Sequence, residues 1–193
     1  LKEYRRAVIV GADHTYGKGS VQSLISLPSD LGAMKVTTGV YFLPGGQSTQ
    51  RTGVAADVRL PGWQILDDYS EAAQDNALSA QAIAPFLSVS SNGVAQWKTV
   101  DERLTATLAA KSRVRVAKDA KFIKILKDNK EAADRKGLIQ LDDYRKTLKK
   151  ENGGKANPTR LEQKQKVQEQ YEPYINESIN VMLDMVTTKD IQI

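Results

Sequence analysis

The residues with the clearest chemical potential form a short turn, Gly17-Lys18-Gly19, between two segments of β-type composition. Glycine takes up left-handed backbone conformations without a steric cost, so the two glycines would allow the lysine side chain to be directed inward from the turn. A lysine amine that is withdrawn from water gives up its proton more readily and can then accept one from a neighbouring hydroxyl. The turn therefore suggests the general base of a Ser-Lys dyad.

Two other interpretations of the turn stay open on spacing alone. An ordinary surface turn can have the same sequence, and so can a phosphate-binding loop. A P-loop requires Ser or Thr directly after its lysine and an earlier glycine, whereas Lys18 is followed by Gly19 and the earlier glycine would fall at Asp13-His14. The phosphate-binding interpretation is therefore the weakest of the three.

Composition excludes several other kinds of chemistry. The 193 residues contain no cysteine, which excludes disulfides, thiolate zinc sites and a cysteine nucleophile. The single histidine, His14, would have to serve any Ser-His-Asp triad or multi-histidine metal site alone, so neither is expected. Residues 1–6 have neither an initiator Met nor an apolar signal core, and we expect the numbering to start within a longer precursor.

The segments around the turn predict a mixed fold of the α/β (α+β) class. Short β-branched or alternating runs at 7–10, 20–27, 34–43 and 54–60 predict strands, and Gly and Pro residues punctuate them. After Gly62 the composition shifts to Ala, Leu, Lys, Glu and Gln, which favours helices. We therefore expect two domains, residues 1–62 with the turn and a helical part at 63–193.

Five helices are expected in the second part, at about 79–86, 100–118, 120–135, 141–150 and 161–185. Asp119 is placed to cap the helix that begins at Ala120. Pro173 is expected to kink the last helix or to split it in two.

The segment Thr15-Tyr16-Gly17-Lys18-Gly19-Ser20-Val21-Gln22 resembles a signature of the S41 serine proteases, the tail-specific or C-terminal processing peptidases. In that family the lysine is the general base for a serine, and the glutamine four residues later supports it. The resemblance thus implies that Lys18 is the base and that Gln22 supports it. Alternation along an extended strand would also place Lys18 and Gln22 on one face.

Further resemblance extends over most of the chain. Residues 35–57 are similar to the family's strand, its Gly-Gly-Ser-Thr-Gln loop and its Gly-Val-x-Pro-Asp ending, although Ala56 replaces the proline. The helical part resembles the C-terminal extension of the longer tail-specific proteases. The family's serine nucleophile lies upstream of residue 1, so we expect it to be absent from this chain and the chain alone to be inactive. Ser20 belongs to the lysine signature and is expected to be structural.

The resemblance implies a serine endopeptidase of the bacterial periplasm or cell envelope that degrades or processes proteins from their C-termini. It implies protein or peptide substrates with apolar C-termini and no metal or cofactor. The helical extension would support the proteolytic core or dock an adaptor protein. No run approaches the roughly 20 apolar residues that a membrane-spanning helix needs.

Two alternatives belong to other functional classes. The chain could be a non-catalytic interaction or adaptor-docking module. It could also be a basic nucleic-acid-binding helical domain, because residues 111–127 contain seven Lys or Arg and one Asp. Without interleaved aromatic residues, a solvated helix face is the preferred interpretation of this basic run, and no nucleic-acid partner is expected.

Overall fold

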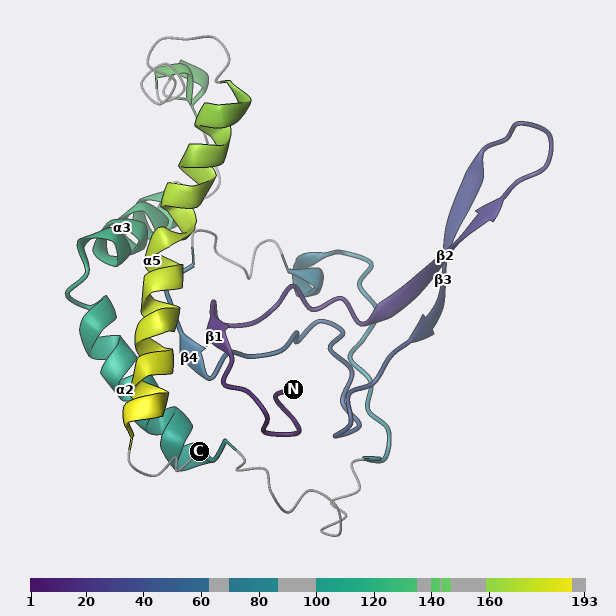
Figure 1. Cartoon of the computed structure of the whole chain (residues 1–193). Helices are drawn as coiled ribbons and strands as arrows, with labels where there is room; N and C mark the ends of the chain where they lie inside the picture. The colour runs from purple at the N-terminus through teal and green to yellow at the C-terminus, as the bar shows by residue number, and fades with distance from the viewer. Residues whose placement is uncertain (63–69, 87–99, 135–139, 143, 147–158, 189–193) are drawn as a thin grey trace. The chain divides into compact units, whose positions relative to one another are not determined.

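The chain is described from a computed structural model, in which residues 1–62, 70–86, 100–134, 140–142, 144–146 and 159–188 are placed well enough to describe (Figure 1). It divides into two compact units, Leu1–Ala109 and Ala110–Ile193. The mixed α/β class predicted from the sequence is confirmed, since strands dominate the first unit and helices the second. The boundary predicted after residue 62 stays a prediction, because residues 63–69 lie outside the described part.

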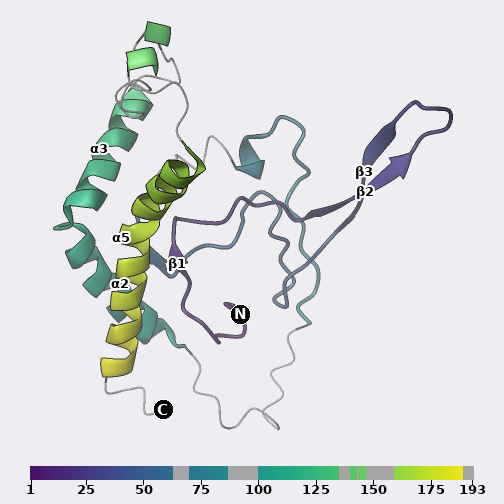
Figure 2. The same ribbon diagram turned by 45° about the horizontal axis from the view of Figure 1, so that its top comes forward.

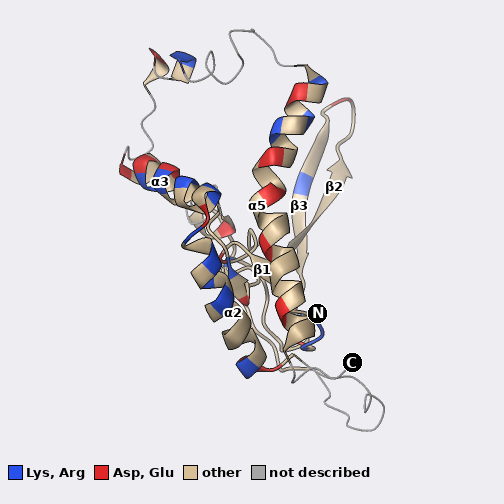
Figure 3. Cartoon of the chain, turned by 60° about the vertical axis from the view of Figure 1, so that its left-hand side comes forward, with Lys and Arg blue, Asp and Glu red and all other residues tan. Residues whose placement is uncertain are grey.

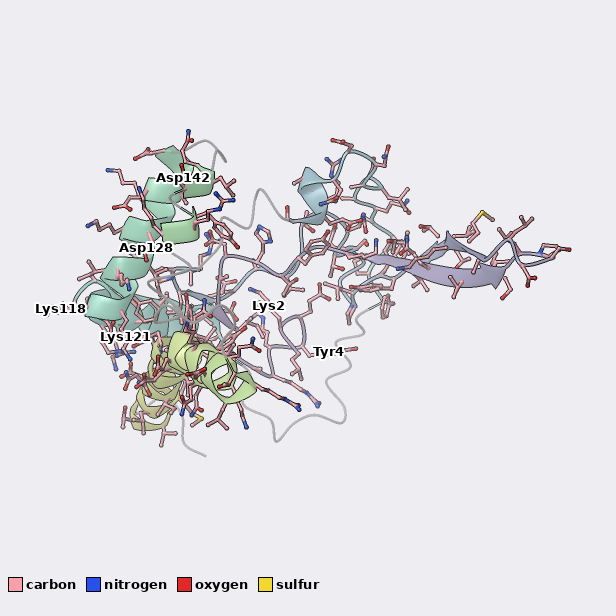
Figure 4. The ribbon with its side chains drawn as sticks, turned by 90° about the horizontal axis from the view of Figure 1, so that it is seen from above. Lys2, Tyr4, Lys118, Lys121, Asp128 and Asp142 are labelled. Atoms are coloured by element: carbon pink, nitrogen blue, oxygen red, sulfur yellow. The ribbon has the colours of Figure 1, made fainter. Side chains whose placement is uncertain are left out.

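The buried centre of the first unit lies along a two-stranded parallel sheet. Strand β1 (Val10–Gly11) pairs with β4 (Val58–Arg59), with Val10 opposite Val58. Val58 and Leu60 are almost fully buried. Asp57 Oδ2 accepts a hydrogen bond from the Ile9 amide at 2.8 Å, and Asp57 Oδ1 lies 2.8 Å from the Lys2 ammonium, labelled in Figure 4. Two strands whose paired residues are 48 positions apart in sequence are thus joined by both backbone pairing and a half-buried carboxylate.

The two strands predicted after the turn form an antiparallel hairpin. Strand β2 (Ser20–Ser26) pairs with β3 (Ala33–Val40), from Ser20 opposite Val40 to Ser26 opposite Ala33. Figure 1 shows the hairpin extending away from the β1–β4 sheet. The register shifts between Val21 and Gln22, so the regular alternation of side chains is interrupted close to the turn.

The predicted helix at 79–86 is wrong. Those residues are extended and lie beside residues 44–48: Ser48 N donates to Gln81 O at 3.0 Å, and Ile83 N donates to Gly46 O at 2.8 Å. Because these backbone groups bind another segment, they are not available for a helical ladder. Pro85 also lacks the amide proton that helix continuation would need. The helix-favouring composition of residues 79–86 therefore did not decide their structure; hydrogen bonding to residues 44–48 did.

Three helices make up most of the described part of the chain after residue 100 (Figure 2). They are α2 (Glu102–Val116), α3 (Ala120–Asp134) and α5 (Arg160–Thr187). These three predictions are confirmed to within two residues. The predicted cap is also confirmed, because Asp119 Oδ1 accepts from Lys121 N at 2.7 Å and from Phe122 N at 3.2 Å. Much of the predicted helix at 141–150 lies outside the described residues.

Pro173 was predicted to kink the last helix or to split it in two, and it does not split it. Helix α5 is unbroken from Arg160 to Thr187 with Pro173 inside it. Pro173, Glu177 and Val181 are buried and recur every four residues, so they form one face of the helix. The packing of this face offsets the cost of about 3 kcal/mol that an internal proline imposes.

The second unit is held together by aromatic packing and ion pairs. Phe122 of α3 is 1% exposed, and its ring meets Tyr174 of α5 edge-on, with centroids 5.3 Å apart. Burial raises the pKa of Tyr174 to about 12. Arg115 Nη2 lies 2.8 Å from Glu177 Oε1, and its Nη1 lies 2.7 Å from Asp184 Oδ2. The hydrogen bonds that Arg115 donates to Glu177 and Asp184 raise its pKa against the opposing effect of burial.

Figure 3 shows the charge pattern of these helices, with basic residues along α2 and α3 and several acidic ones along α5. Lys111 joins the Arg115 cluster through Asp184, and the Lys121 ammonium lies 2.6 Å from Glu172. Within the described residues, no helix has the length and apolar character needed to span a membrane.

Candidate active site around Lys18

The turn that contains Lys18 is packed tightly against the loop at residues 48–51. Gly17 has φ +92°, the left-handed region in which a side chain would be strained. A Cβ added at Gly19 would stand 2.6 Å from both Gln50 N and Ser48 Oγ. Both glycines are therefore required by the close approach of the two loops.

Hydrogen bonds fix the main chain on both sides of the lysine. Arg51 N donates to Gly17 O at 2.7 Å, and the Tyr41 hydroxyl donates to Lys18 O at 2.9 Å. Gly19 N donates to Gln50 Oε1 at 2.8 Å. The backbone is thus held at three consecutive residues, and the Lys18 side chain extends from a rigid support.

The Lys18 ammonium lies 3.4 Å from Glu71 Oε1. Its side chain is 40% exposed, whereas that of Glu71 is only 9% exposed. Glu71 is the first residue of a single 3-10 turn, η1 (Glu71–Ala73), and its amide donates to Tyr16 O at 2.9 Å. Lys18 therefore contacts a buried carboxylate, but its own side chain is exposed, whereas the turn suggested a lysine directed inward and withdrawn from water.

Gln22, the predicted support of the lysine, lies elsewhere in the described structure. Its Nε2 is 3.4 Å from Thr37 Oγ1, across the hairpin. The register shift between Val21 and Gln22 interrupts the alternation that would place Lys18 and Gln22 on one face. The role of Gln22 stays a prediction.

Sequence reasoning missed the residues that contact the Lys18 turn. Gln50 is completely buried; its Oε1 accepts from Gly19 N, and its Nε2 donates to Glu71 Oε1 at 2.9 Å. Thr49 Oγ1 donates to the Tyr41 hydroxyl at 2.8 Å. The sequence signals for Thr49 and Gln50 were the polar run at 47–50 and its similarity to the family's Gly-Gly-Ser-Thr-Gln loop, and nothing in the sequence connected Glu71 with the turn.

Other predicted positions behave as structural residues. Ser20 begins β2, opposite Val40. Nδ1 of His14 lies 2.7 Å from Thr15 O, and His14 bridges Ala55. Among the described residues, no group of three or more His, Asp or Glu side chains could hold a metal ion.

Comparison with known proteins identifies the family that the first part of the chain resembles. Residues 1–60, which include the Lys18 turn and the loop at 48–51, match the sequence model of peptidase family S41. Residues 1–60 belong to peptidase family S41. The predicted family is thereby confirmed, and the S41 segment contains Lys18, Gln22 and Gln50, whereas Glu71 follows it.

Two relatives extend the comparison. The chain is 36% identical to the tail-specific protease of Haemophilus influenzae over 150 residues, which is 72% of this chain and 21% of that protein. It is 43% identical to the carboxy-terminal-processing protease of Bartonella bacilliformis over 58 residues, 30% of this chain and 13% of that protein. The chain thus spans about a fifth or less of the length of these two relatives, and the similarity to the tail-specific protease continues beyond residues 1–60.

Proposed function

We propose that the complete protein containing this chain is a serine endopeptidase that degrades or processes proteins from their C-termini, with Lys18 as its general base. The observation that carries the proposal is the rigid turn: three hydrogen bonds to the main chain hold residues 17–19, and the Lys18 side chain extends from them. The names of the two relatives, a tail-specific and a carboxy-terminal-processing protease, support the substrate class.

In the proposed mechanism, a serine from outside this chain attacks the scissile carbonyl. The neutral Lys18 amine takes the hydroxyl proton during the attack and returns it to the leaving amine when the peptide bond breaks. Gln22 is proposed to orient the amine, as the family resemblance implies. Residues 1–193 alone would then bind no substrate productively and would not hydrolyse peptides.

The proposal is tested by replacing Lys18 in the full gene product that contains this chain. Lys18→Ala is expected to lower kcat for an unfolded substrate with an apolar C-terminus by at least about 100-fold, because general-base catalysis is lost. Lys35→Ala is the matched control, since Lys35 is an exposed lysine of β3 in the same unit. Full activity of Lys18→Ala, with the variant folded, would refute the dyad.

We also propose that the protein acts in the bacterial periplasm or cell envelope. Both relatives are bacterial proteases, which supports the bacterial part of the proposal. Fractionation of cells that express the full gene product would test it. Recovery of the protein in the cytoplasmic fraction would contradict it.

A second candidate function, docking of an adaptor protein, concerns the helical unit. Apolar side chains that are 45–56% exposed recur every four residues along α5, at Val167, Tyr171, Ile175, Ile179 and Leu183. An exposed apolar row on a helix is suited to helix-in-groove recognition. The alternative of a nucleic-acid-binding surface has less support, because Lys111, Arg115 and Lys121 of the basic run are paired with carboxylates of α5.

A further inference from the structure

Gln50 is the most completely buried polar side chain in the described part of the first unit, with 0% exposure. A buried amide costs free energy unless both its oxygen and its nitrogen are hydrogen-bonded. Both ends of Gln50 are satisfied, by Gly19 N at 2.8 Å and by Glu71 Oε1 at 2.9 Å. Its orientation is fixed, because a reversed amide would place donor against donor at Gly19 and acceptor against acceptor at Glu71.

These two partners lie at the two ends of Lys18. Gly19 is the next residue of the main chain, and Glu71 contacts the ammonium at the tip of the side chain. We propose that Gln50 is a positioning residue for Lys18, acting through the Gly19 amide on the backbone and through the Glu71 carboxylate on the amine. The inference rests on the proposed role of Lys18 as a general base.

The surroundings leave little freedom for another residue at position 50. A Cβ at Gly19 would stand 2.6 Å from Gln50 N, so the two backbones are already in close contact. An apolar side chain at 50 would leave the Gly19 amide and the Glu71 carboxylate without this partner. A glutamate there would still accept from Gly19 N but would face Glu71 with a second negative charge. Of the common side chains, glutamine alone of this length offers both an acceptor and a donor.

Glu71 provides the negative charge that contacts the Lys18 ammonium. Its Oε1 accepts from Gln50 and lies 3.4 Å from the Lys18 ammonium. Through this carboxylate, the tip of the Lys18 side chain is linked to the side chain of Gln50. Other ionisable residues next to the turn or Glu71 include Tyr16, whose carbonyl accepts from Glu71 N, Tyr41, whose hydroxyl binds Lys18 O, and Arg51, whose guanidinium lies 3.4 Å from Ala72 O.

Exchange of the two side chains tests the inference in the full gene product. Gln50→Glu is expected to lower kcat by about 10- to 100-fold with KM changed by less than about twofold, because the base is misplaced and substrate contacts are kept. The double variant Gln50→Glu with Glu71→Gln restores a donor and an acceptor between positions 50 and 71. It is expected to recover kcat to within about threefold of wild type.

A second measurement does not depend on proteolysis. The rate at which acetic anhydride acetylates Lys18, followed by mass spectrometry relative to Lys35, is expected to change by at least about threefold in Glu71→Gln, since the contact that holds the amine is weakened. Glu71→Gln keeps an acceptor for Gln50 Nε2, so this variant is expected to fold. Melting temperatures of all variants serve as the folding control.

The outcomes separate the two proposals. If Lys18→Ala is inactive while Gln50→Glu keeps wild-type kcat, the positioning role is wrong and the dyad stands. If Lys18→Ala is active, both fall. If Gln50→Glu does not fold, the double variant decides: low kcat in a folded double variant, or an unchanged rate of Lys18 acetylation in Glu71→Gln, overturns the positioning role.

Discussion

At the scale of single residues, Gly19 decides how closely the lysine turn can approach the loop at 48–51. The absence of a Cβ lets the Gly19 amide reach Gln50 Oε1, and a Cβ would collide with Gln50 N and Ser48 Oγ at 2.6 Å. The same glycine thus provides both the close packing of the loops and the hydrogen bond that fixes the residue after Lys18.

Gly19→Ala is therefore expected to destabilise the first unit by about 1–3 kcal/mol, because the main chain of the facing loop has to move. Native-state hydrogen exchange of the β2 amides would measure the change in the free energy of unfolding. Gly39→Ala is the control, since a Cβ at Gly39 of β3 meets no heavy atom within 4 Å. Equal effects of the two substitutions would show that close packing at Gly19 is not the cause.

At the scale of elements, the contact between α3 and α5 includes one buried aromatic pair besides the Lys121–Glu172 ion pair. Phe122 is buried to 1% exposure and lies edge-on to Tyr174, with an interplanar angle of 83°. Asp119 caps α3, which begins at Ala120, so local sequence places Phe122 in the first turn of the helix. Its burial depends on α5, which provides Tyr174.

Phe122→Ala is expected to lower the free energy of unfolding of the helical unit by about 3–5 kcal/mol, through the lost apolar burial and the cavity left behind. Thermal or urea denaturation followed by helical circular dichroism would measure it. The neighbouring substitution Ile123→Ala, at a residue that is 49% exposed, is expected to stay within about 1 kcal/mol of wild type. A loss at Ile123 as large as that at Phe122 would contradict this account of the packing.

At the scale of the whole molecule, the net charge is +5, and residues 111–127 alone contain seven Lys or Arg and one Asp. Some of these cations are paired with carboxylates of α5. Asp184 contributes to this neutralisation by binding both Arg115 and Lys111. Burial acts to raise the pKa of Asp184, but the hydrogen bonds from Arg115 and Lys111 lower it below the ordinary value of an aspartate.

The lowered pKa predicts how stability changes with pH. A carboxyl whose pKa is lowered by folding stabilises the folded state above its unfolded pKa, about 4, and this contribution is lost as the pH falls through the folded value. Asp184→Asn is expected to cost about 1–3 kcal/mol at neutral pH and much less in acid. Denaturation of wild type and variant across this pH range would measure the difference.

Asp128→Asn, at an exposed position of α3, provides the matched control for the loss of one negative charge. Its effect on stability at neutral pH is expected to be within about 0.5 kcal/mol. A cost of Asp184→Asn that stays the same from neutral pH to strong acid would contradict the assignment of the stability to the ionised carboxylate.

The sequence by itself determined the local features of this protein. Strands at 20–26 and 33–40 follow from β-branched alternation around a turn, and α2, α3 and the Asp119 cap follow from composition and capping chemistry. The S41 family was evident from the residues around Lys18. These features depend on residues that are close together in sequence, so their physical causes can be identified there.

Only the tertiary structure decided what surrounds the lysine. Glu71 and Gln50 stand 53 and 31 residues from the groups that they contact at the turn, and the segment 79–86 is extended because its backbone binds residues 44–48. Buried polar groups take whichever partner the fold brings within hydrogen-bonding distance, and local propensity yields to that requirement. The sequence therefore located the candidate base, whereas long-range hydrogen bonding determined its neighbours.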